Sequence, residues 1–182
     1  MQKGKNEGMQ NNAPKRSKKG EFLSWTGVIV VALIIAILIR VFVFEFVVVQ
    51  QSSMYPTLQE NEKLFLLKTS YWFHEPERGD IVIVKVEEHV RYVKRVIALP
   101  GETVKVQDNT VYINDEPLDE KYLSSDLVYP DFEQVQVPEG KIFVMGDNRA
   151  NSIDSRSPTV GFIDLKDVSG KITFRFSPFT KF

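Results

Sequence analysis

The chain has 182 residues, 43% of them hydrophobic, and a formal net charge of −1. This length accommodates one domain of ordinary size and a short appendage. The sequence contains no cysteine, which excludes disulfides, thiolate catalysis and cysteine-ligated zinc. Residues 1–20 carry six basic side chains and one acidic one, which leaves the rest of the chain with a charge of −6. A nucleic-acid-binding domain normally has a basic face, so we expect no nucleic-acid partner.

Residues 22–39 form an apolar stretch of eighteen residues without a charged side chain. As a helix it would be about 27 Å long, close to the thickness of a membrane's hydrocarbon core. The basic residues before it place the N-terminus in the cytoplasm by the positive-inside rule. A cleaved secretory signal is the alternative, but the apolar stretch is long for one and no small-x-small site follows it. We therefore predict a cytoplasmic tail at 1–20, a membrane anchor at 21–40 and an extracytoplasmic catalytic β domain at 41–182.

The rest of the chain is rich in short strand patterns. Residues 41–50 are β-branched and aromatic, which favours a strand over further helix. Alternating apolar residues bounded by turn signals predict further strands at 63–67, 81–86, 90–99, 103–107, 110–114, 134–137, 141–144 and 171–176. Asp108-Asn109 is a hairpin signal. Residues 115–134 are polar and irregular, which predicts a loop with short extended pieces, and residues 163–168 suit a short helical turn. The fold class predicted is mainly β, an antiparallel sheet or barrel-like domain after one transmembrane helix.

Ser53 is the first candidate for chemistry. It lies where the strand at 41–50 gives way to a turn that contains Pro56. A serine in such a turn can be an exposed nucleophile, with a backbone N–H of its own turn near the oxyanion that forms. Taken alone, however, a serine in such a motif is more typical of an ordinary turn than of a nucleophile.

Lys94 is the second candidate. Strand alternation puts it on the same face as Val90, Tyr92 and Val96. A lysine among apolar neighbours is either an edge residue whose ammonium reaches solvent or a desolvated base, because burial disfavours its charged form. In the second case its pKa falls well below the free value of about 10.4. His74 and His89 lie in polar surroundings and are interpreted as surface residues, which disfavours a histidine-based triad.

A dense polar segment, residues 146–156, follows the apolar strand at 141–144. It suits either a solvated loop or a loop beside an active site. Asp154 and Arg156 could form a bidentate pair, and Ser152 could orient the lysine amine. The neighbouring arginines argue against metal binding by Asp147 and Asp154, so we expect no metal and no cofactor.

Four segments together resemble type I signal peptidases, specifically the single-span Gram-positive form. Each is a weak signal alone, but all four in order behind one apolar span are specific. The segments are Ser53-Met54-Tyr55-Pro56-Thr57-Leu58, Arg78-Gly79-Asp80-Ile81-Val82, residues 91–101 around Lys94, and Gly146-Asp147-Asn148-Arg149 with Ser152, Asp154, Ser155 and Arg156.

The resemblance implies a membrane-bound serine endopeptidase that removes signal peptides from secretory preproteins after Ala-x-Ala-like sites. Its substrate would lie as an added strand, and an apolar surface of the β domain would contact the lipid bilayer. Ser53 would be the nucleophile, Lys94 the general base and Ser152 the residue that hydrogen-bonds the lysine. Residues implied to support the site are Asp147, Asn148, Asp154, Arg156 and Arg95, and Met54 is a candidate for the substrate pocket.

Gln51 departs from the pattern of some members, which place a second oxyanion donor two residues before the nucleophile. The backbone N–H of Ser53 is therefore the safer donor, with Gln51 as a candidate. Two other readings compete with the peptidase. A self-cleaving repressor would need a DNA-binding domain that residues 1–40 do not offer. A catalytically inactive paralogue that acts as a membrane-anchored binding module would leave the combination of Ser53, Lys94 and Ser152 unexplained.

Overall fold

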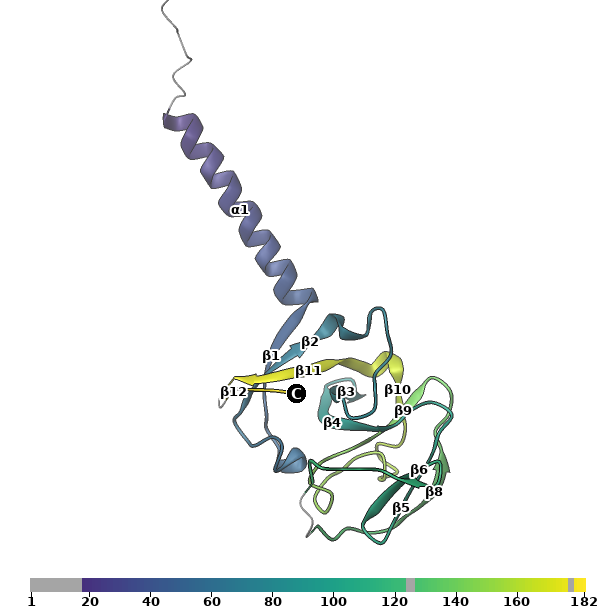
Figure 1. The fold of residues 1–182 in the computed structure, drawn as a ribbon. Coiled ribbons are helices and arrows are strands. Elements are labelled where there is room, and N and C mark those ends of the chain that lie inside the picture. The colour runs from purple at the N-terminus through teal and green to yellow at the C-terminus, as the bar shows by residue number, and fades with distance from the viewer. Residues whose placement is uncertain (1–17, 124–126, 177–178) are drawn as a thin grey trace, which may run out of the picture. The chain divides into compact units, whose positions relative to one another are not determined.

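The structure is a computed structural model that describes residues 18–123, 127–176 and 179–182 (Figure 1). Most of the basic tail predicted at 1–20 lies outside the described residues. The chain divides after Leu38 into an N-terminal unit and a β domain, Ile39–Phe182.

The N-terminal apolar stretch is helical, as predicted. Helix α1 spans Lys18–Phe42, and its segment Trp25–Phe42 has a mean hydropathy of 2.6, long and apolar enough to cross a membrane. The helix continues two residues past the predicted end of the anchor at residue 40, and its last turn includes Arg40. A cation is favourable there because it faces the negative end of the helix dipole. The strand predicted from residue 41 consequently begins only at Phe44.

The β domain contains a large antiparallel sheet with the strand order β1-β2-β11-β3-β4-β9-β10, and β12 pairs with β11. Its strands are β1 Phe44–Val48, β2 Lys63–Leu67, β3 Ile81–Glu87, β4 Val90–Ala98, β9 Lys141–Met145, β10 Ile163–Asp164, β11 Val168–Phe176 and β12 Phe179–Lys181. The sheet confirms the predicted fold class of a mainly β, antiparallel domain after one apolar helix.

A smaller antiparallel sheet has the order β7-β6-β5-β8. Its strands are β5 Thr103–Gln107, β6 Thr110–Ile113, β7 Glu116–Pro117 and β8 Phe132–Gln136. Asp108 and Asn109 both have positive φ, 50° and 59°, which suits the tight hairpin predicted between β5 and β6. Residues 115–134, expected to be a loop with short extended pieces, contain β7 and the start of β8. Within residues 163–168 the structure has β10 and then the 3-10 helix Leu165–Asp167, which is the short helical turn predicted there.

Three apolar clusters hold the β domain together. One lies between the small sheet and the ends of β4 and β9, around Phe143. A second packs the turn after β1 onto β2 and β3, through Met54, Leu58 and Leu64. The third lies on the other side of β3, β4 and β9, around Val96. The polar segment 146–156 therefore begins directly after β9, a strand that contributes residues to two of these clusters.

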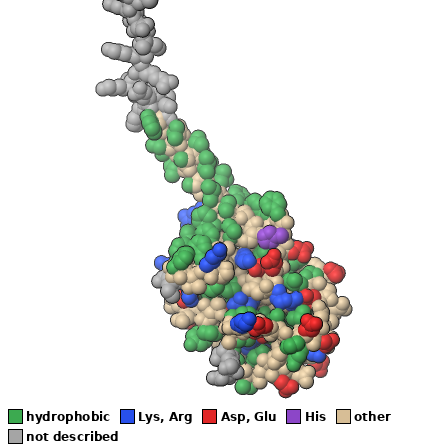
Figure 2. All heavy atoms as spheres, in the orientation of Figure 1, with side chains coloured by type: hydrophobic (Ala, Val, Ile, Leu, Met, Phe, Trp, Pro, Cys, Tyr) green, Lys and Arg blue, Asp and Glu red, His purple; other side chains and the backbone are tan. Residues whose placement is uncertain are grey.

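Aromatic rings also gather at the surface of the β domain. The rings of Phe44, Phe46 and Phe65 contact one another, and those of Phe174, Phe176 and Phe179 continue the cluster. Phe46 is 57% exposed and Phe179 is 73% exposed. Figure 2 shows hydrophobic side chains gathered on the part of this face where β1 lies. We refer to these six phenylalanines as the aromatic surface.

Candidate active site

Ser53 lies in a 3-10 helix, Ser52–Met54, five residues after the end of β1. Met54 is 1% exposed and packs into the cluster under β2 and β3, which anchors the turn from below. Asn148 fixes it from the side: its backbone N–H donates to Ser53 O at 2.9 Å and its side-chain amide donates to Ser52 O at 3.1 Å. The serine that the sequence placed at a turn is therefore held by both apolar packing and the polar segment.

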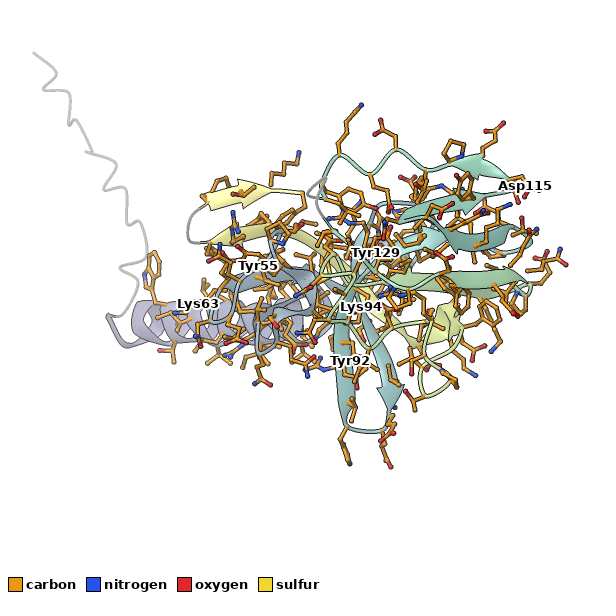
Figure 3. The ribbon with its side chains drawn as sticks, turned by 90° about the horizontal axis from the view of Figure 1, so that it is seen from below. Tyr55, Lys63, Tyr92, Lys94, Asp115 and Tyr129 are labelled. Carbon is orange, nitrogen blue, oxygen red and sulfur yellow. The ribbon has the colours of Figure 1, made fainter. Side chains whose placement is uncertain are left out.

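Lys94 lies in β4, and only 1% of the residue is exposed. Figure 3 places it in the middle of the β domain, with Tyr92 farther along the same strand. Its Nζ is hydrogen-bonded to Ser53 Oγ at 2.7 Å and lies 5.2 Å from the centre of the Tyr92 ring. The structure thus brings together two candidates that are 41 positions apart in the sequence.

Burial lowers the pKa of Lys94 to about 8, because the charged ammonium loses its hydration in this position. The charges around it partly cancel. Asp154 and Asp147 act to raise the pKa of Lys94, whereas Arg156 acts to lower it. At pH 7 roughly a tenth of the lysine would then be the neutral amine, against a few in ten thousand at the free value.

We expect the pH profile of kcat/KM to report this titration. If the neutral Lys94 amine is the reactive form, the rate should rise about tenfold per pH unit below pH 8 and level off above it. The measurement is cleavage of a preprotein by the full chain between pH 6 and pH 10, at equal ionic strength. A rate that does not change across pH 8 would contradict a general-base role for this lysine.

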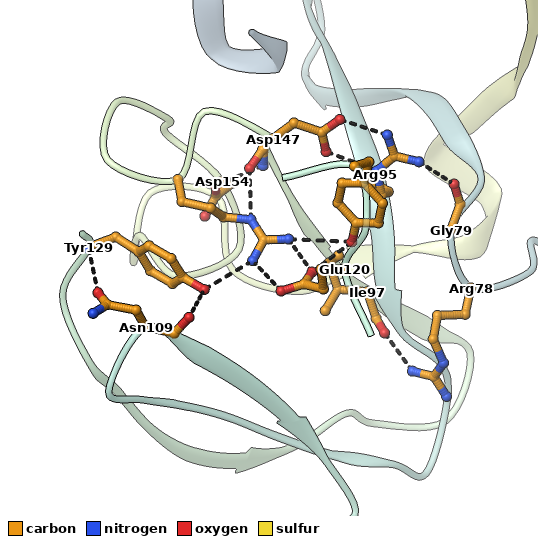
Figure 4. A network of polar contacts seen from close by, with 12 residues as sticks. Arg78, Gly79, Arg95, Ile97, Asn109, Glu120, Tyr129, Asp147 and Asp154 are labelled. Carbon is orange, nitrogen blue, oxygen red and sulfur yellow. Dashed lines mark hydrogen bonds and ion pairs between the residues drawn. The ribbon is translucent and has the colours of Figure 1, made fainter. Parts of the chain in front are cut away.

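Two ion pairs fix the polar segment 146–156, and Figure 4 shows the first of them, between Arg95 and Asp147. Arg95, next to Lys94, donates to Asp147 through Nε at 2.8 Å and Nη2 at 2.6 Å. Asp147 also accepts a 2.5 Å hydrogen bond from Thr57 Oγ1, in the turn after Ser53. Asp147 is fully buried, and its contacts with Arg95 and Thr57 connect the polar segment to β4 and to the serine turn.

Asp154 and Arg156 form the second pair, with the bidentate geometry that the sequence suggested. Arg156 Nε donates to Asp154 Oδ1 at 2.9 Å and Nη2 donates to Oδ2 at 2.8 Å. The N–H of Gly146 also donates to Asp154 Oδ2, at 3.0 Å. Burial opposes the charge of Asp154, but the guanidinium and this N–H outweigh it and keep the pKa of the carboxyl below its ordinary value.

Gly146 allows the polar segment to approach the serine. A Cβ at this position would lie 2.2 Å from Ser152 Oγ and 2.4 Å from Ser53 O. Ser152 was expected to hydrogen-bond the lysine. Instead, its hydroxyl oxygen is buried without a hydrogen-bond partner of ordinary geometry among the described residues, although it is close enough to Asp154 to help lower the pKa of that carboxyl.

A groove of about 460 Å³ runs along the site between the segment Glu45–Met54 and the start of β4. Gln51 and Met54 both line it; Gln51 is exposed and Met54 is buried. Among the described residues, β1 pairs only with β2, and β9 covers β4 only from Arg95 onward. Both walls of the groove therefore include a strand edge without a partner strand. His89 lines the groove and His74 does not, and among the described residues Ser53 Oγ is hydrogen-bonded to Lys94 and to neither histidine.

Part of the polar network was not predicted from the sequence. Arg149 is 1% exposed and forms an ion pair with Glu120, which comes from the stretch expected to be irregular. Tyr122 and Tyr129 enclose this pair. Arg149 could have been noticed as part of the matched polar segment, but no pattern in the sequence marks Glu120. Within the described ranges, no group of three or more His, Asp or Glu side chains is placed to hold a metal ion.

Comparison with known proteins identifies the family. The family described as "Signal peptidase, peptidase S26" matches residues 22–177. A signal peptidase I of Bacillus licheniformis is 46% identical over 175 residues, which cover 91% of this chain and 94% of the relative. Signal peptidase I T of Bacillus subtilis is 44% identical over 187 residues, covering 96% of each chain. A crystal structure of a signal peptidase I from Enterococcus faecalis is 38% identical and covers 54% of this chain and 97% of its own, with a TM-score of 0.48. Because the family match and both Bacillus relatives extend over most of the sequence, the chain belongs to the S26 signal peptidase family and is a peptidase, as its motifs predicted.

Proposed function

We propose that this peptidase removes signal peptides from secretory preproteins with Ser53 as nucleophile and Lys94 as general base. The observation that carries the proposal is the 2.7 Å contact between Lys94 Nζ and Ser53 Oγ, made by a lysine that is 1% exposed. Desolvation makes the neutral amine accessible near pH 8, and the contact places it where it can take the hydroxyl proton.

In the first half of the reaction, Ser53 Oγ attacks the carbonyl carbon of the cleaved peptide bond while its proton passes to the Lys94 amine. The tetrahedral intermediate collapses when the ammonium returns that proton to the leaving amine, which leaves the signal peptide as an ester on Ser53. In the second half Lys94 takes a proton from water, the hydroxide attacks the ester, and the proton returns to Ser53.

The oxyanion of each intermediate needs hydrogen-bond donors. We assign the first to the backbone N–H of Ser53. The Gln51 side chain, which is exposed and lines the groove two residues before the nucleophile, is the candidate for the second. One such donor typically contributes about 3 kcal/mol of transition-state stabilisation.

We propose that the substrate binds in the groove as an added strand. The two unpartnered strand edges, on β1 and on the start of β4, supply backbone donors and acceptors for an extended peptide. Beside Ser53, the groove is lined by Met54, Ile83 and Val93, whose bulk leaves room only for small side chains of the substrate. This lining supports cleavage after small-x-small sites such as Ala-x-Ala.

We further propose that α1 is an uncleaved anchor, with the N-terminus in the cytoplasm and the β domain outside. The apolar segment Trp25–Phe42 supports the span, and the basic residues before it support the orientation. The exposed phenylalanine rings of the aromatic surface support contact of the β domain with lipid, because a contiguous exposed apolar patch is typical of a membrane interaction site.

The first test is cleavage of a preprotein with an Ala-x-Ala site by the detergent-solubilised full chain. We expect release of the mature protein by the unmutated chain, and none above background by Ser53→Ala. Ser52→Ala is the matched control, since the adjacent serine contributes only backbone contacts to the site, and its rate should stay within a few-fold of the unmutated rate.

The same assay tests the specificity. A preprotein with phenylalanine in place of the alanine before the cleaved bond should not be processed. Cleavage by Ser53→Ala equal to that of the unmutated chain would refute the assignment of the nucleophile. Equal processing of the phenylalanine substrate would refute the small-residue pockets but leave the nucleophile in place.

A further inference from the structure

Glu120, which follows the short strand β7, lies against Arg149 of the polar segment. Arg149 Nη1 donates to Glu120 Oε2 at 2.9 Å, and Nη2 donates to Oε1. Only 8% of the Glu120 side chain and none of the Arg149 side chain is exposed. Burial opposes the charge of Arg149, but Glu120 outweighs it and holds the pKa of the guanidinium above its ordinary value.

Tyrosine rings close off this pair from solvent. Tyr122 donates its hydroxyl to Glu120 Oε1 at 2.6 Å, and its ring lies 3.8 Å from the guanidinium carbon of Arg95. Tyr129, visible beside the network in Figure 4, donates to the backbone oxygen of Asn109 in the small sheet. Glu120, Tyr122 and Tyr129 therefore contact the polar segment through Arg149, and none of the three belongs to a family motif in the sequence.

The pair connects to the serine through the backbone of the polar segment. Arg149 Nε donates to Gly146 O at 3.1 Å, while Arg156 Nη2 donates to Arg149 O at 2.9 Å. Gly146 is the residue whose Cα lies against Ser53 O. Two contacts therefore connect the Arg149 guanidinium to Ser53: one from Arg149 to Gly146 and one from Gly146 to Ser53. A movement of the guanidinium is passed to the nucleophile through Gly146.

We infer that Glu120 is a positioning residue for the proposed Ser53–Lys94 chemistry, acting through Arg149 on the backbone at Gly146. The inference rests on the proposed function. Without the Glu120 carboxylate, the Arg149 guanidinium is a buried cation without its counter-ion, and it must turn toward other acceptors. The Gly146 carbonyl then loses its donor, and the wall against Ser53 shifts.

The test is steady-state cleavage by Glu120→Gln in the full chain. We expect kcat to fall about 10²-fold, the typical loss for a displacement of about 1 Å at a reacting group. KM should change less than about twofold, because the contacts of Glu120 and Arg149 include no groove residue. The matched control is Asp119→Asn, the preceding acidic residue, which pairs with Lys121 on the surface and should leave both constants unchanged.

A double-mutant cycle separates positioning from general support of the fold. If Glu120 acts through Arg149, then Glu120→Gln combined with Arg149→Lys should lose no more kcat than the more severe single variant. Losses that multiply would refute the route through Arg149. Rates are compared per folded molecule, from circular dichroism of each preparation. A Glu120→Gln protein that melts earlier but keeps kcat within twofold would show a purely structural role and overturn the inference.

A second variant covers the case in which Glu120→Gln does not fold. Glu120→Asp keeps the charge but is one methylene too short for the two-bond geometry, and we expect a kcat between those of the unmutated chain and Glu120→Gln. An unmutated kcat in Glu120→Asp would contradict the inference. If the unmutated chain and Asp119→Asn both cleave and the Glu120 variants do so equally well, only this inference fails. If the unmutated chain does not cleave, the proposed function fails with it.

Discussion

Replacing Lys94 with methionine is expected to abolish cleavage and at the same time to stabilise the folded protein. Loss of a general base typically costs 10²–10⁴-fold in rate, and a base that also returns the proton to the leaving group belongs at about the upper end of that range. The Ser53 hydroxyl remains in place, but its hydrogen-bond partner at 2.7 Å is removed. Among the described residues, no other side chain is hydrogen-bonded to that hydroxyl and placed to take its proton.

The stabilisation follows from the low pKa of the lysine. Folding lowers the pKa of Lys94 from 10.5 to about 8, which corresponds to a cost of about 3 kcal/mol at neutral pH. Methionine is of similar length, neutral and well suited to an irregular apolar space. Loss of the hydrogen bond to Ser53 reduces this gain in stability by about 1 kcal/mol. We therefore expect Lys94→Met to be more stable than the unmutated chain by about 2 kcal/mol at pH 7.

The pH dependence of this gain tests its cause. Between pH 8 and pH 10.5 the unfolded chain still holds the lysine proton that the folded protein has released, so the stability of the unmutated protein rises with pH. The advantage of Lys94→Met should thus be full below pH 8 and disappear by about pH 10.5. Thermal unfolding of both full chains in detergent at pH 7 and pH 10 measures it. Lys85→Met on β3, an exposed lysine, is the control and should change neither activity nor stability.

The elements and the site differ in how far the sequence predicts them. The β5–β6 hairpin was predicted because two local signals agree: alternating apolar residues and Asp108-Asn109, which tolerate positive φ. Alternation along β4 also predicted that Tyr92 and Lys94 lie on the same face of the strand. It could not give the contact between Lys94 and Ser53, because nothing local relates two residues 41 positions apart. That pairing came from the resemblance of the motifs.

Buried charge is what the sequence conceals most completely. Glu120 lies in a polar stretch that has neither a helical nor a strand period, and in the sequence it is indistinguishable from its exposed neighbour Asp119. Only the tertiary packing of Tyr122 and Arg149 against it separates the two. The same limit applies to Ser152, whose expected bond to the lysine depends on side-chain placement that spacing alone does not determine.

The second large effect is expected from Asp154→Asn, which should both destabilise the protein and shift its pH profile. Asp154 is fully buried and accepts hydrogen bonds from Arg156 and from the Gly146 N–H. Asparagine has nearly the same shape, but its NH₂ group is a donor and would face the N–H donors of Arg156 or Gly146. The Arg156 guanidinium would also lose its counter-ion. Removing one partner of a buried pair typically costs about 3–5 kcal/mol. We expect a loss of stability of this size at pH 7.

The loss should depend on pH in the direction set by a lowered pKa. Arg156 and the Gly146 N–H hold the pKa of Asp154 below its ordinary value in the folded protein, against the effect of burial. The carboxylate therefore stabilises the unmutated protein above the ordinary carboxyl pKa, about 4. That contribution is lost as the pH falls through the lowered pKa, so the difference between the two proteins should shrink in acid. Thermal unfolding at pH 7 and at about pH 3 measures it.

The activity of the Asp154→Asn molecules that still fold is the more specific test. Asp154 is the charge that most raises the pKa of Lys94. With asparagine in its place the neutral amine becomes more favourable, so the midpoint of the kcat/KM profile should move to lower pH. Asp164→Asn is the control, because Asp164 pairs with Lys141 at the surface of β10 and should change neither stability nor the midpoint. A midpoint that stays in place, or moves upward, would mean that Lys94 does not respond to the charge of Asp154, and the electrostatic account of the proposed base would have to be abandoned.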